Sequence, residues 1–413
     1  MNAKAVDSAR ISELAEKQKD ALIALRQELH ANPELSWQEV ETSKMVEQRL
    51  SELGFEKIRR GFKGTDSGVT AELTGGRTVS NEEAPPPCVA LRADLDALPI
   101  TEETDVSFAS TVEGVMHACG HDAHTTILLG VADVLAQMKD QFAGRIRLLF
   151  QPAEEAGTDS GAPALIDEGA LDGVDAAAGL HVWAQLPFGV LGFRKGTLLA
   201  SADIWEVVLQ GEGGHGAMPH TAVDPTVAAA HLISMLQTVV SREIDPLDSA
   251  VVSVGKIESG DAPNVIPDKA TIKGNIRTTN RNTRSEMENR IRRIVEGVSS
   301  ALRCTAELTY TPIYPVTVND DELTDLYTEI AAGVLGAENV REVPIAMGSE
   351  DFSYYGEHVP AAFVILGMGD AEEGTDKPHH SPHFKTHDDI LVPAVKILTT
   401  FALRFLATRG QQT

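Results

Sequence analysis

The spacing of apolar residues changes along the chain, and each change predicts a different arrangement of helices and strands. Apolar positions recur at helical spacing over residues 8–31, and a second helix is expected at about residues 37–53. From residue 88, apolar strands alternate with helices: VALRADLDALP, RIRLLFQPAEE and DAAAGLHVW are strands with their exits. The intervening helices fall on DAHTTILLGVADVLAQMKD and near residues 161–169. This alternation predicts an α/β domain with a mixed, largely parallel sheet flanked by helices.

The order of predicted elements changes from residue 199 onward, where it becomes strand, helix, strand, strand, helix, strand. This βαββαβ order is that of a ferredoxin-like sandwich. After it, a helix at about 321–335, the strand AAFVILGMG and the helix DDILVPAVKILTTFALRFLAT return to the first arrangement. We therefore expect a discontinuous catalytic domain, residues 1–198 and 313–413, with residues 199–312 inserted as a second domain.

Composition narrows the possible partners. The formal net charge of the 413 residues is -26 and no Lys/Arg cluster stands out, which argues against nucleic-acid or anionic-membrane binding. The N-terminus lacks the apolar core of a signal peptide, and no 18-residue apolar run is evident, so a cytoplasmic location is expected. The three cysteines are too few and too scattered for a disulfide framework.

Polar clusters come directly after the apolar strands of the first arrangement. Asp94 and Asp96 follow one strand, Glu154 and Glu155 follow another, and His181 follows DAAAGL. The carboxyl ends of parallel strands meet at one edge of a sheet, where ligands bind. A glutamate pair there suits metal-assisted hydrolysis, because one carboxylate can bind a cation while the other moves the proton of a water.

The stretch MHACGHDAHT adds a thiol and three histidines just before a helix. Alone, the Cys119-x-His121 pair is weak, and without a second Cys-rich pair a zinc finger is disfavoured. Together with the glutamates, His181 and the histidine-rich KPHHSPHFKTH, it would form a mixed Cys, His and Glu donor set that suits Zn, Co, Ni or Mn more than Mg or Ca. No G-x-S-x-G elbow supports a serine hydrolase. A cysteine hydrolase using Cys119 with His121 or His117 stays open, but it leaves the glutamate pair without a role.

Ten sequence motifs, in the order in which they occur, make the chain similar to the M20 family of metallopeptidases and amidohydrolases. The similarity is to the branch of hippurate hydrolases, N-acyl-amino-acid amidohydrolases and auxin-conjugate hydrolases. The motifs span nearly the whole chain, and MHACGHD with QPAEE is specific to this branch. The motifs are LHANPELSWQEVETS, RADLDALP, MHACGHDAHT, QPAEE, GLHVW, GEGGHGAMPH, DAPNVIPD, GNIRTTN, GSEDFSYY and HHSPHF.

The resemblance implies a zinc-exopeptidase-like sheet with an inserted lid and two divalent metal ions per subunit, zinc first, with Mn, Co or Ni as alternatives. It implies that Glu154 is the general base and acid and that Asp96 orients the site. It also implies a cysteine bridge between the ions and four further ligands. These five positions are Cys119, His121, Glu155, His181 and His380.

In the lid, the resemblance assigns three residues to the substrate. His215 is similar to a residue that polarises the scissile carbonyl, in the same subunit or across a subunit boundary. Asn264 and Arg277 match positions that contact the amide or carboxylate of the substrate, and Arg suits bidentate carboxylate binding. The same likeness implies a homodimer or homotetramer assembled through the lid.

The function that follows is hydrolysis of the amide of an N-acyl amino acid, a small-molecule substrate, to a carboxylic acid and a free amino acid. A dipeptidase or aminopeptidase of the same family is the first alternative, and a metal-binding scaffold without catalysis is the second. The chain departs from the branch at residues 156–163, AGTDSGAP, where a run of glycines is usual. That departure concerns the acyl-group preference rather than the chemistry.

Overall fold

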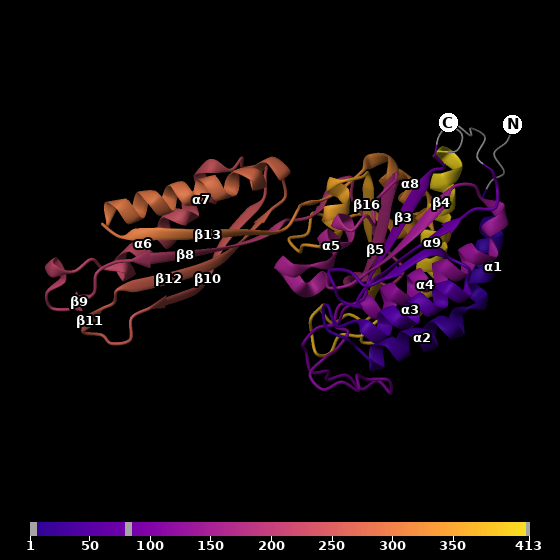
Figure 1. Cartoon of the computed structure of the whole chain (residues 1–413), viewed down its shortest axis with the longest axis horizontal. Helices are drawn as coiled ribbons and strands as arrows, with labels where there is room; N and C mark the ends of the chain where they lie inside the picture. The colour runs from indigo at the N-terminus through magenta and orange to yellow at the C-terminus, as the bar shows by residue number, and fades with distance from the viewer. Residues whose placement is uncertain (1–5, 79–84, 410–413) are drawn as a thin grey trace. The chain divides into compact units, whose positions relative to one another are not determined.

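A computed structural model describes residues 6–78 and 85–409 of the chain, and these form two compact units (Figure 1). The first unit runs to Leu198 and resumes at Val318–Pro344 and from Tyr354 onward. The second comprises Leu199–Thr317 and Ile345–Ser353. The chain passes from one unit to the other four times. Two of these crossings fall within the short strands β7 (Gly196–Leu199) and β14 (Thr317–Asn319), and the other two bound Ile345–Ser353. The segment Ile345–Ser353 thus belongs to the second unit, although sequence alone assigned it to the catalytic domain.

An eight-stranded sheet forms the centre of the first unit, in the order β1-β2-β4-β3-β5-β16-β6-β15. The four central strands β4, β3, β5 and β16 run parallel, while β1, β2 and β6 pair antiparallel with a neighbour. This confirms the mixed, largely parallel sheet. The strand bounds are Glu56–Arg60 (β1), Val69–Thr74 (β2), Cys88–Asp94 (β3), Arg145–Gln151 (β4), Ala176–Pro187 (β5), Leu191–Phe193 (β6), Val340–Glu342 (β15) and Ala361–Gly369 (β16).

Helices α4 and α9 pack against β3 of this sheet, and α1 and α2 lie over them (Figure 1). Helix α4 is buried on nearly every side, which explains why its sequence is apolar all round. The helices of this unit are Ser8–Lys17 (α1), Lys19–Ala31 (α2), Val40–Glu52 (α3), His121–Gln137 (α4), Gly161–Asp167 (α5), Asp321–Leu335 (α8) and Leu391–Arg409 (α9). The single helix expected over residues 8–31 is therefore two helices, because the backbone of Gln18 leaves the helical region at φ -96 and ψ 4.

Helix α9 corrects the expectation that no 18-residue segment is apolar enough to cross a bilayer. The helical segment Asp388–Arg409 contains such a window, with a mean hydropathy of 1.8. Within that window, 78% of the residues are buried inside the protein, where α9 packs on α1, α4 and α8. Its composition is accounted for by its place in the core of the first unit.

The second unit is a four-stranded antiparallel sheet in the order β10-β12-β8-β13, with α6 and α7 packed on it (Figure 1). Its chain order is the expected βαββαβ, extended by a small ribbon of β9 and β11. The bounds are Ala202–Gln210 (β8), Gly214–His215 (β9), Pro225–Thr238 (α6), Ala250–Ser259 (β10), Val265–Ile266 (β11), Lys269–Thr278 (β12), Arg281–Ala301 (α7) and Thr305–Tyr314 (β13). The unit has its own hydrophobic core.

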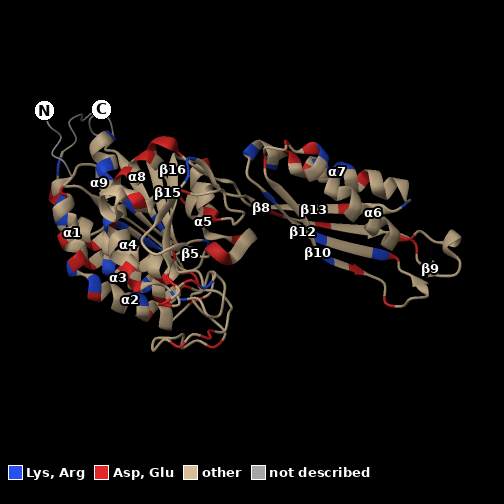
Figure 2. Cartoon of the chain, turned by 180° about the vertical axis from the view of Figure 1, so that it is seen from behind, with Lys and Arg blue, Asp and Glu red and all other residues tan. Residues whose placement is uncertain are grey.

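Charged side chains are mixed on the described surface. On the face that Figure 2 draws, Lys and Arg are interspersed with Asp and Glu along α1, α2 and α3 and along α7. Many are paired, as in the ion pair between Arg292 and Glu288 on α7. Along these helices of the described chain, basic and acidic residues are therefore mixed rather than separated.

Candidate metal centre and the paired-glutamate turn

Cys119 and His121 flank Gly120 at the start of α4. Gly120 between them has a φ of 90°, which an L side chain rarely adopts. A Cβ on Gly120 would also lie 2.4 Å from a methyl carbon of Val182. Glycine is therefore required here, and it lets the thiol and the imidazole leave the tight turn before α4.

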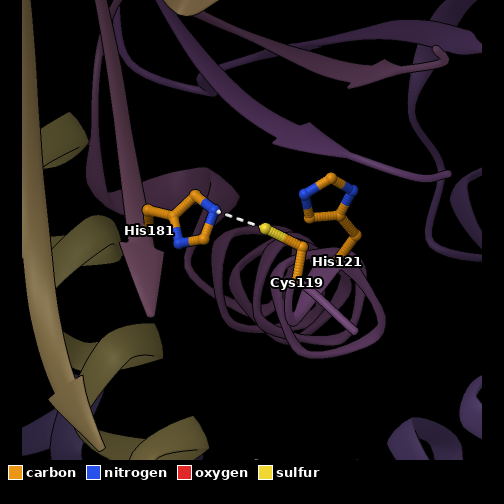
Figure 3. Close-up of side chains that lie close together, drawn as sticks. All are labelled: Cys119, His121 and His181. Atoms are coloured by element: carbon orange, nitrogen blue, oxygen red, sulfur yellow. Dashed lines mark hydrogen bonds between the residues drawn. The ribbon is translucent and has the colours of Figure 1, made fainter. Parts of the chain in front are cut away.

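His181 on β5 meets these two residues, so that Cys119, His121 and His181 form a cluster whose ligand atoms lie within 4.8 Å of one another. The Cys119 Sγ atom lies 3.5 Å from His181 Nε2 and points between the two imidazole rings (Figure 3). The Nδ1 atom of His181 lies 2.5 Å from the carbonyl oxygen of Val182. A donor at Nδ1 leaves the lone pair of Nε2 directed at the thiol, which is the tautomer that a metal ligand needs.

The His121 ring, like that of His181, is oriented by a backbone carbonyl oxygen at its Nδ1 atom. Its Nδ1 atom lies 2.9 Å from the carbonyl oxygen of Asp96, while its Nε2 atom is buried and has no hydrogen-bond partner. Buried polar atoms without a partner are uncommon in folded proteins. Burial opposes a charge on this ring, but the carboxylates of Asp94 and Asp96 raise the pKa of His121 to about 10. The surroundings of Nε2 therefore favour positive charge, whether a proton or a metal ion supplies it.

The paired glutamates lie in a 3-10 turn, Glu154–Asp159, that follows β4. The Asp96 carboxylate accepts hydrogen bonds from the backbone N–H groups of Glu154 and Glu155, both at 3.0 Å. Ser36 donates a third hydrogen bond to Asp96 at 2.7 Å. Burial raises the pKa of Asp96, but hydrogen bonding to His121 and Ser36 overcomes this and lowers it. A charged Asp96 thus holds both the glutamate turn and His121.

His380 reaches the cluster from the C-terminal segment. Its Nε2 atom lies 3.0 Å from Oε1 of Glu155, and these two residues with Cys119 form a second possible metal-binding group. The same Glu155 oxygen has no partner by hydrogen-bond geometry, so we interpret the contact as two ligand atoms at close range rather than as an aligned hydrogen bond. His380 has a φ of 64°, and its N–H donates to the carbonyl of Ala118.

Cys119 belongs to both groups, one with His121 and His181 and the other with Glu155 and His380. One thiolate flanked by two such groups fits a pair of borderline-soft divalent ions. Burial and the nearby carboxylates of Glu155 and Glu154 raise the pKa of the Cys119 thiol well above its usual value. The protein alone does not stabilise a thiolate there, which argues against the cysteine-hydrolase alternative, whereas a cation would stabilise one.

Two neighbouring histidines have both ring nitrogens engaged. His124, one turn along α4 from His121, lies 2.6 Å from an Asp94 oxygen and accepts the N–H of Val182 at 2.9 Å. His379 lies 3.8 Å from Cys119 Sγ through Nδ1, and its Nε2 accepts the N–H of Ala184 at 3.2 Å. These rings therefore support the cluster, and sequence spacing had not distinguished His379 from the adjacent His380.

The three residues assigned to the substrate lie in the second unit. His215 on β9 and Asn264, directly before β11, are exposed neighbours, since Gly216 N–H donates to the Asn264 carbonyl at 2.8 Å. His215 Nδ1 accepts the N–H of Ala217 at 3.0 Å, which leaves Nε2 as a donor. Arg277 on β12 is half-buried. It makes no salt bridge among the described residues, although the negative charge of Asp203 acts on it. Their roles toward the substrate stay predictions.

One residue at the glutamate turn escaped sequence reasoning. Glu39 is fully buried, and its Oε1 atom accepts the backbone N–H of Ala153 at 2.7 Å. Ala153 precedes the glutamates and has a left-handed φ of 55°, a conformation that costs a non-glycine residue about 1–3 kcal/mol. Glu39 stands in the motif LHANPELSWQEVETS, but no local spacing rule connects it to a turn 114 residues away.

Comparisons with known proteins agree with this geometry. The model of a family described as Peptidase family M20/M25/M40 matches residues 90–404. The thermostable carboxypeptidase 2 of Saccharolobus solfataricus is 38% identical over 387 residues, which cover 94% of this chain and 95% of that protein. The IAA-amino acid hydrolase ILR1-like 2 of Arabidopsis thaliana is 39% identical, over 95% of this chain and 87% of that protein. The N-acetyl-L-cysteine deacetylase of Bacillus subtilis is 40% identical, over 93% and 88%.

A solved structure resembles the chain over nearly its whole length. The crystal structure of the Bacillus subtilis YXEP protein, described as a dinuclear metal-binding peptidase, superposes with a TM-score of 0.81 and 36% sequence identity. The match covers 95% of this chain and 99% of that one. A dinuclear metal centre in that protein agrees with two donor groups that share Cys119 in this one.

Proposed function

Because this chain belongs to peptidase family M20/M25/M40, we propose that it is a metal-dependent amidohydrolase that cleaves N-acyl amino acids to a carboxylic acid and a free amino acid. The observation that carries the proposal is the position of Glu154. This carboxylate is buried, its backbone N–H is anchored on Asp96, and it lies in one group with His121 and Glu155. A base beside a donor set is what hydrolysis needs and what a metal-binding scaffold does not.

The ligands of the two ions would be the residues of the two donor groups. The donor types fit zinc first, then Mn, Co or Ni, because a thiolate and imidazoles accompany a single carboxylate. When bound, such ions lower the pKa of a water and stabilise negative charge on a carbonyl oxygen. These ligands would be Cys119, His121, Glu155, His181 and His380.

Glu154 would move the proton in both halves of the reaction. As general base it takes a proton from the attacking water, and as general acid it delivers that proton to the leaving nitrogen of the amide. Asp96 holds the turn that carries Glu154 and the ring of His121, so the base and the ligand set share one support. In the second unit, the Nε2 donor of His215 would stabilise the developing oxyanion.

The choice of substrate class rests on relatives and on Arg277. One relative is described as an IAA-amino acid hydrolase and another as an N-acetyl-L-cysteine deacetylase, both of which act on amino acids with a blocked amine. Arg277, which makes no salt bridge among the described residues, suits the free carboxylate of such a substrate. Lid closure, a homodimer or homotetramer and a cytoplasmic location stay predictions.

A carboxypeptidase-type peptidase is the second candidate, and a specific observation favours it: a relative described as a thermostable carboxypeptidase is 38% identical over 94% of this chain. Both candidates require a substrate with a free carboxylate next to the scissile amide. They differ only in whether the acyl side carries an amino group.

One experiment tests the mechanism and separates the candidates. The protein is stripped with a chelator, reloaded with Zn, Mn, Co or Ni, and assayed on N-acetyl, N-benzoyl, longer N-acyl and indole-acetyl amino acids and on dipeptides. We expect activity to return only with metal and to favour N-acyl amino acids over dipeptides. The variant Glu154→Gln should bind the same amount of metal and lose about 100- to 10,000-fold in kcat. Full turnover by the chelated protein, or by Glu154→Gln, would refute the mechanism.

A further inference from the structure

We propose that Glu39 is a positioning residue for the catalytic glutamate: its buried carboxyl group holds the backbone of Ala153 and thereby sets the place of Glu154. Three successive N–H groups enter the glutamate turn, those of Ala153, Glu154 and Glu155. Glu39 accepts the first at 2.7 Å, and Asp96 accepts the other two at 3.0 Å each. The inference rests on the assignment of Glu154 in the proposed function.

Glu39 does not serve its own helix, which supports a role for its side chain at the glutamate turn. Glu39 occupies the N-cap position of α3, where a side chain normally accepts an N–H of its own helix, but it makes no such bond. Glu34 does this instead, because its carboxylate accepts the N–H groups of Glu41 at 3.1 Å and Thr42 at 2.8 Å. With α3 capped by Glu34, the Glu39 side chain is free to reach Ala153.

The residues around Glu39 also form hydrogen bonds with the glutamate turn and with the carboxylate that supports it. Ser36 donates to Asp96 at 2.7 Å, and the indole N–H of Trp37 donates to the carbonyl of Asp159 at 2.6 Å. Asp159 closes the 3-10 turn that begins at Glu154. We call residues 36–39 the clasp. It contacts the residue before Glu154, the end of the turn and the carboxylate that supports the turn.

The two buried carboxyl groups, those of Glu39 and Asp96, can lie close together if Glu39 is neutral. Burial and the neighbouring Asp96 carboxylate raise the pKa of Glu39, which favours the neutral form of its carboxyl group. A neutral acid accepts the Ala153 N–H without placing a second negative charge beside Asp96. The left-handed backbone of Ala153 needs such a constraint, since an unanchored alanine would relax from it. A shift of Glu154 by about 1 Å would cost roughly 100-fold in rate.

The test compares three substitutions in the metal-loaded full-length protein. Glu39→Met keeps the side-chain length and removes the acceptor, so kcat should fall roughly 10- to 100-fold while KM changes by less than about twofold. Glu39→Gln keeps a neutral acceptor oxygen and should restore kcat to within about threefold of the parent. Glu34→Gln is the matched control in the same segment: it weakens the cap of α3, lowers the melting temperature and leaves kcat unchanged.

Metal content and thermal unfolding are measured for each variant beside the kinetics. The proposal requires that Glu39→Met keep the parental metal content, so that its loss of kcat reports position rather than ligation. If Glu39→Met does not fold, Trp37→Phe decides. It removes the indole donor to Asp159 together with part of the ring, and kcat should fall about threefold. Parental kcat in Glu39→Met, or in Trp37→Phe where that variant decides, overturns the inference, as does a loss of kcat that follows a loss of metal. Full turnover by Glu154→Gln would instead overturn the proposed function itself.

Discussion

The two compact units hold their candidate site residues in opposite ways. In the first unit the ligand atoms are mostly buried, and the rings of His121 and His181 are fixed by a second contact, with the backbone carbonyls of Asp96 and Val182. In the second unit His215 and Asn264 are exposed on a ribbon whose strands are only two residues long. A donor set for metal ions must be preorganised, whereas residues that meet a variable substrate can be carried on adjustable loops.

This contrast has a measurable consequence. Substitutions in the buried cluster should change metal content together with activity. Substitutions in the second unit should change kinetic constants and leave the metal content alone.

The largest effect is expected at the shared ligand. Cys119→Ala removes the donor common to both groups, so bound metal should be lost and kcat should fall about 1,000-fold or more. Metal analysis and steady-state kinetics measure this. Cys88→Ala, at a second buried free cysteine at the start of β3, is the matched control and should keep both values. Parental metal content in Cys119→Ala would contradict the bridge.

A smaller loss is expected at His215. Without its Nε2 donor, His215→Ala should lose about 100-fold in kcat, the usual effect of one oxyanion donor. Metal content and melting temperature should match the parent, because the side chain is exposed and belongs to none of the possible metal-binding groups among the described residues. His220→Ala, a nearby histidine in the same unit, should behave as the parent. Parental kinetics in His215→Ala would remove this residue from the reaction.

At Arg277 the effect should appear in KM. Arg277→Met should raise KM roughly tenfold or more for N-acyl amino acids, the value of a hydrogen bond to a charged group, with a smaller change in kcat. The informative comparison is an N-acyl amino acid amide, which lacks the carboxylate. Parent and variant should bind this compound equally weakly. Arg292→Met, which removes a surface ion pair on α7, serves as the control.

The smallest effect on activity is expected at His30, where the readout is stability. Burial lowers the pKa of His30, but Asp122 and Glu102 outweigh it and raise the value from 6.5 to about 9. The charged ring therefore stabilises the fold fully below about pH 6.5, and this contribution is lost as the pH rises through about 9. Urea unfolding from pH 6 to 9.5 should show the loss in the parent and a flatter profile in His30→Gln. Equal slopes in the two proteins would contradict the assignment.

Much of the fold follows from periodicity. The helix expected at 321–335 is α8, and the strand AAFVILGMG is β16, because each is a single element with one uniform pattern. The βαββαβ order of the second unit appears with the antiparallel pairing of a ferredoxin-like sandwich. The break at Gln18 between α1 and α2 escaped prediction, since apolar spacing continues across it and contains no glycine or proline there.

For the candidate site too, the sequence predicts some features and not others. The motifs name Cys119, His121, Glu154 and Glu155, because metal ligands and bases must be particular residue types at short spacing. Periodicity does not separate His121 from His124, although one has an unpartnered ring nitrogen and the other has both nitrogens engaged. Hydrogen-bond partners distant in the chain make that difference, and only the folded structure contains them.

The sequence by itself determined the class of fold, the main helices and strands, the family and the chemical type of each candidate ligand, since these depend on local pattern and side-chain identity. The tertiary structure decided which donors converge, that Cys119 belongs to two groups, and that Glu39 grips the turn of Glu154. Such contacts join the segments after β3, β4 and β5, the starts of α3 and α4, and the C-terminal loop. The ligand atoms converge because the parallel strands bring their carboxyl ends to one edge of the sheet.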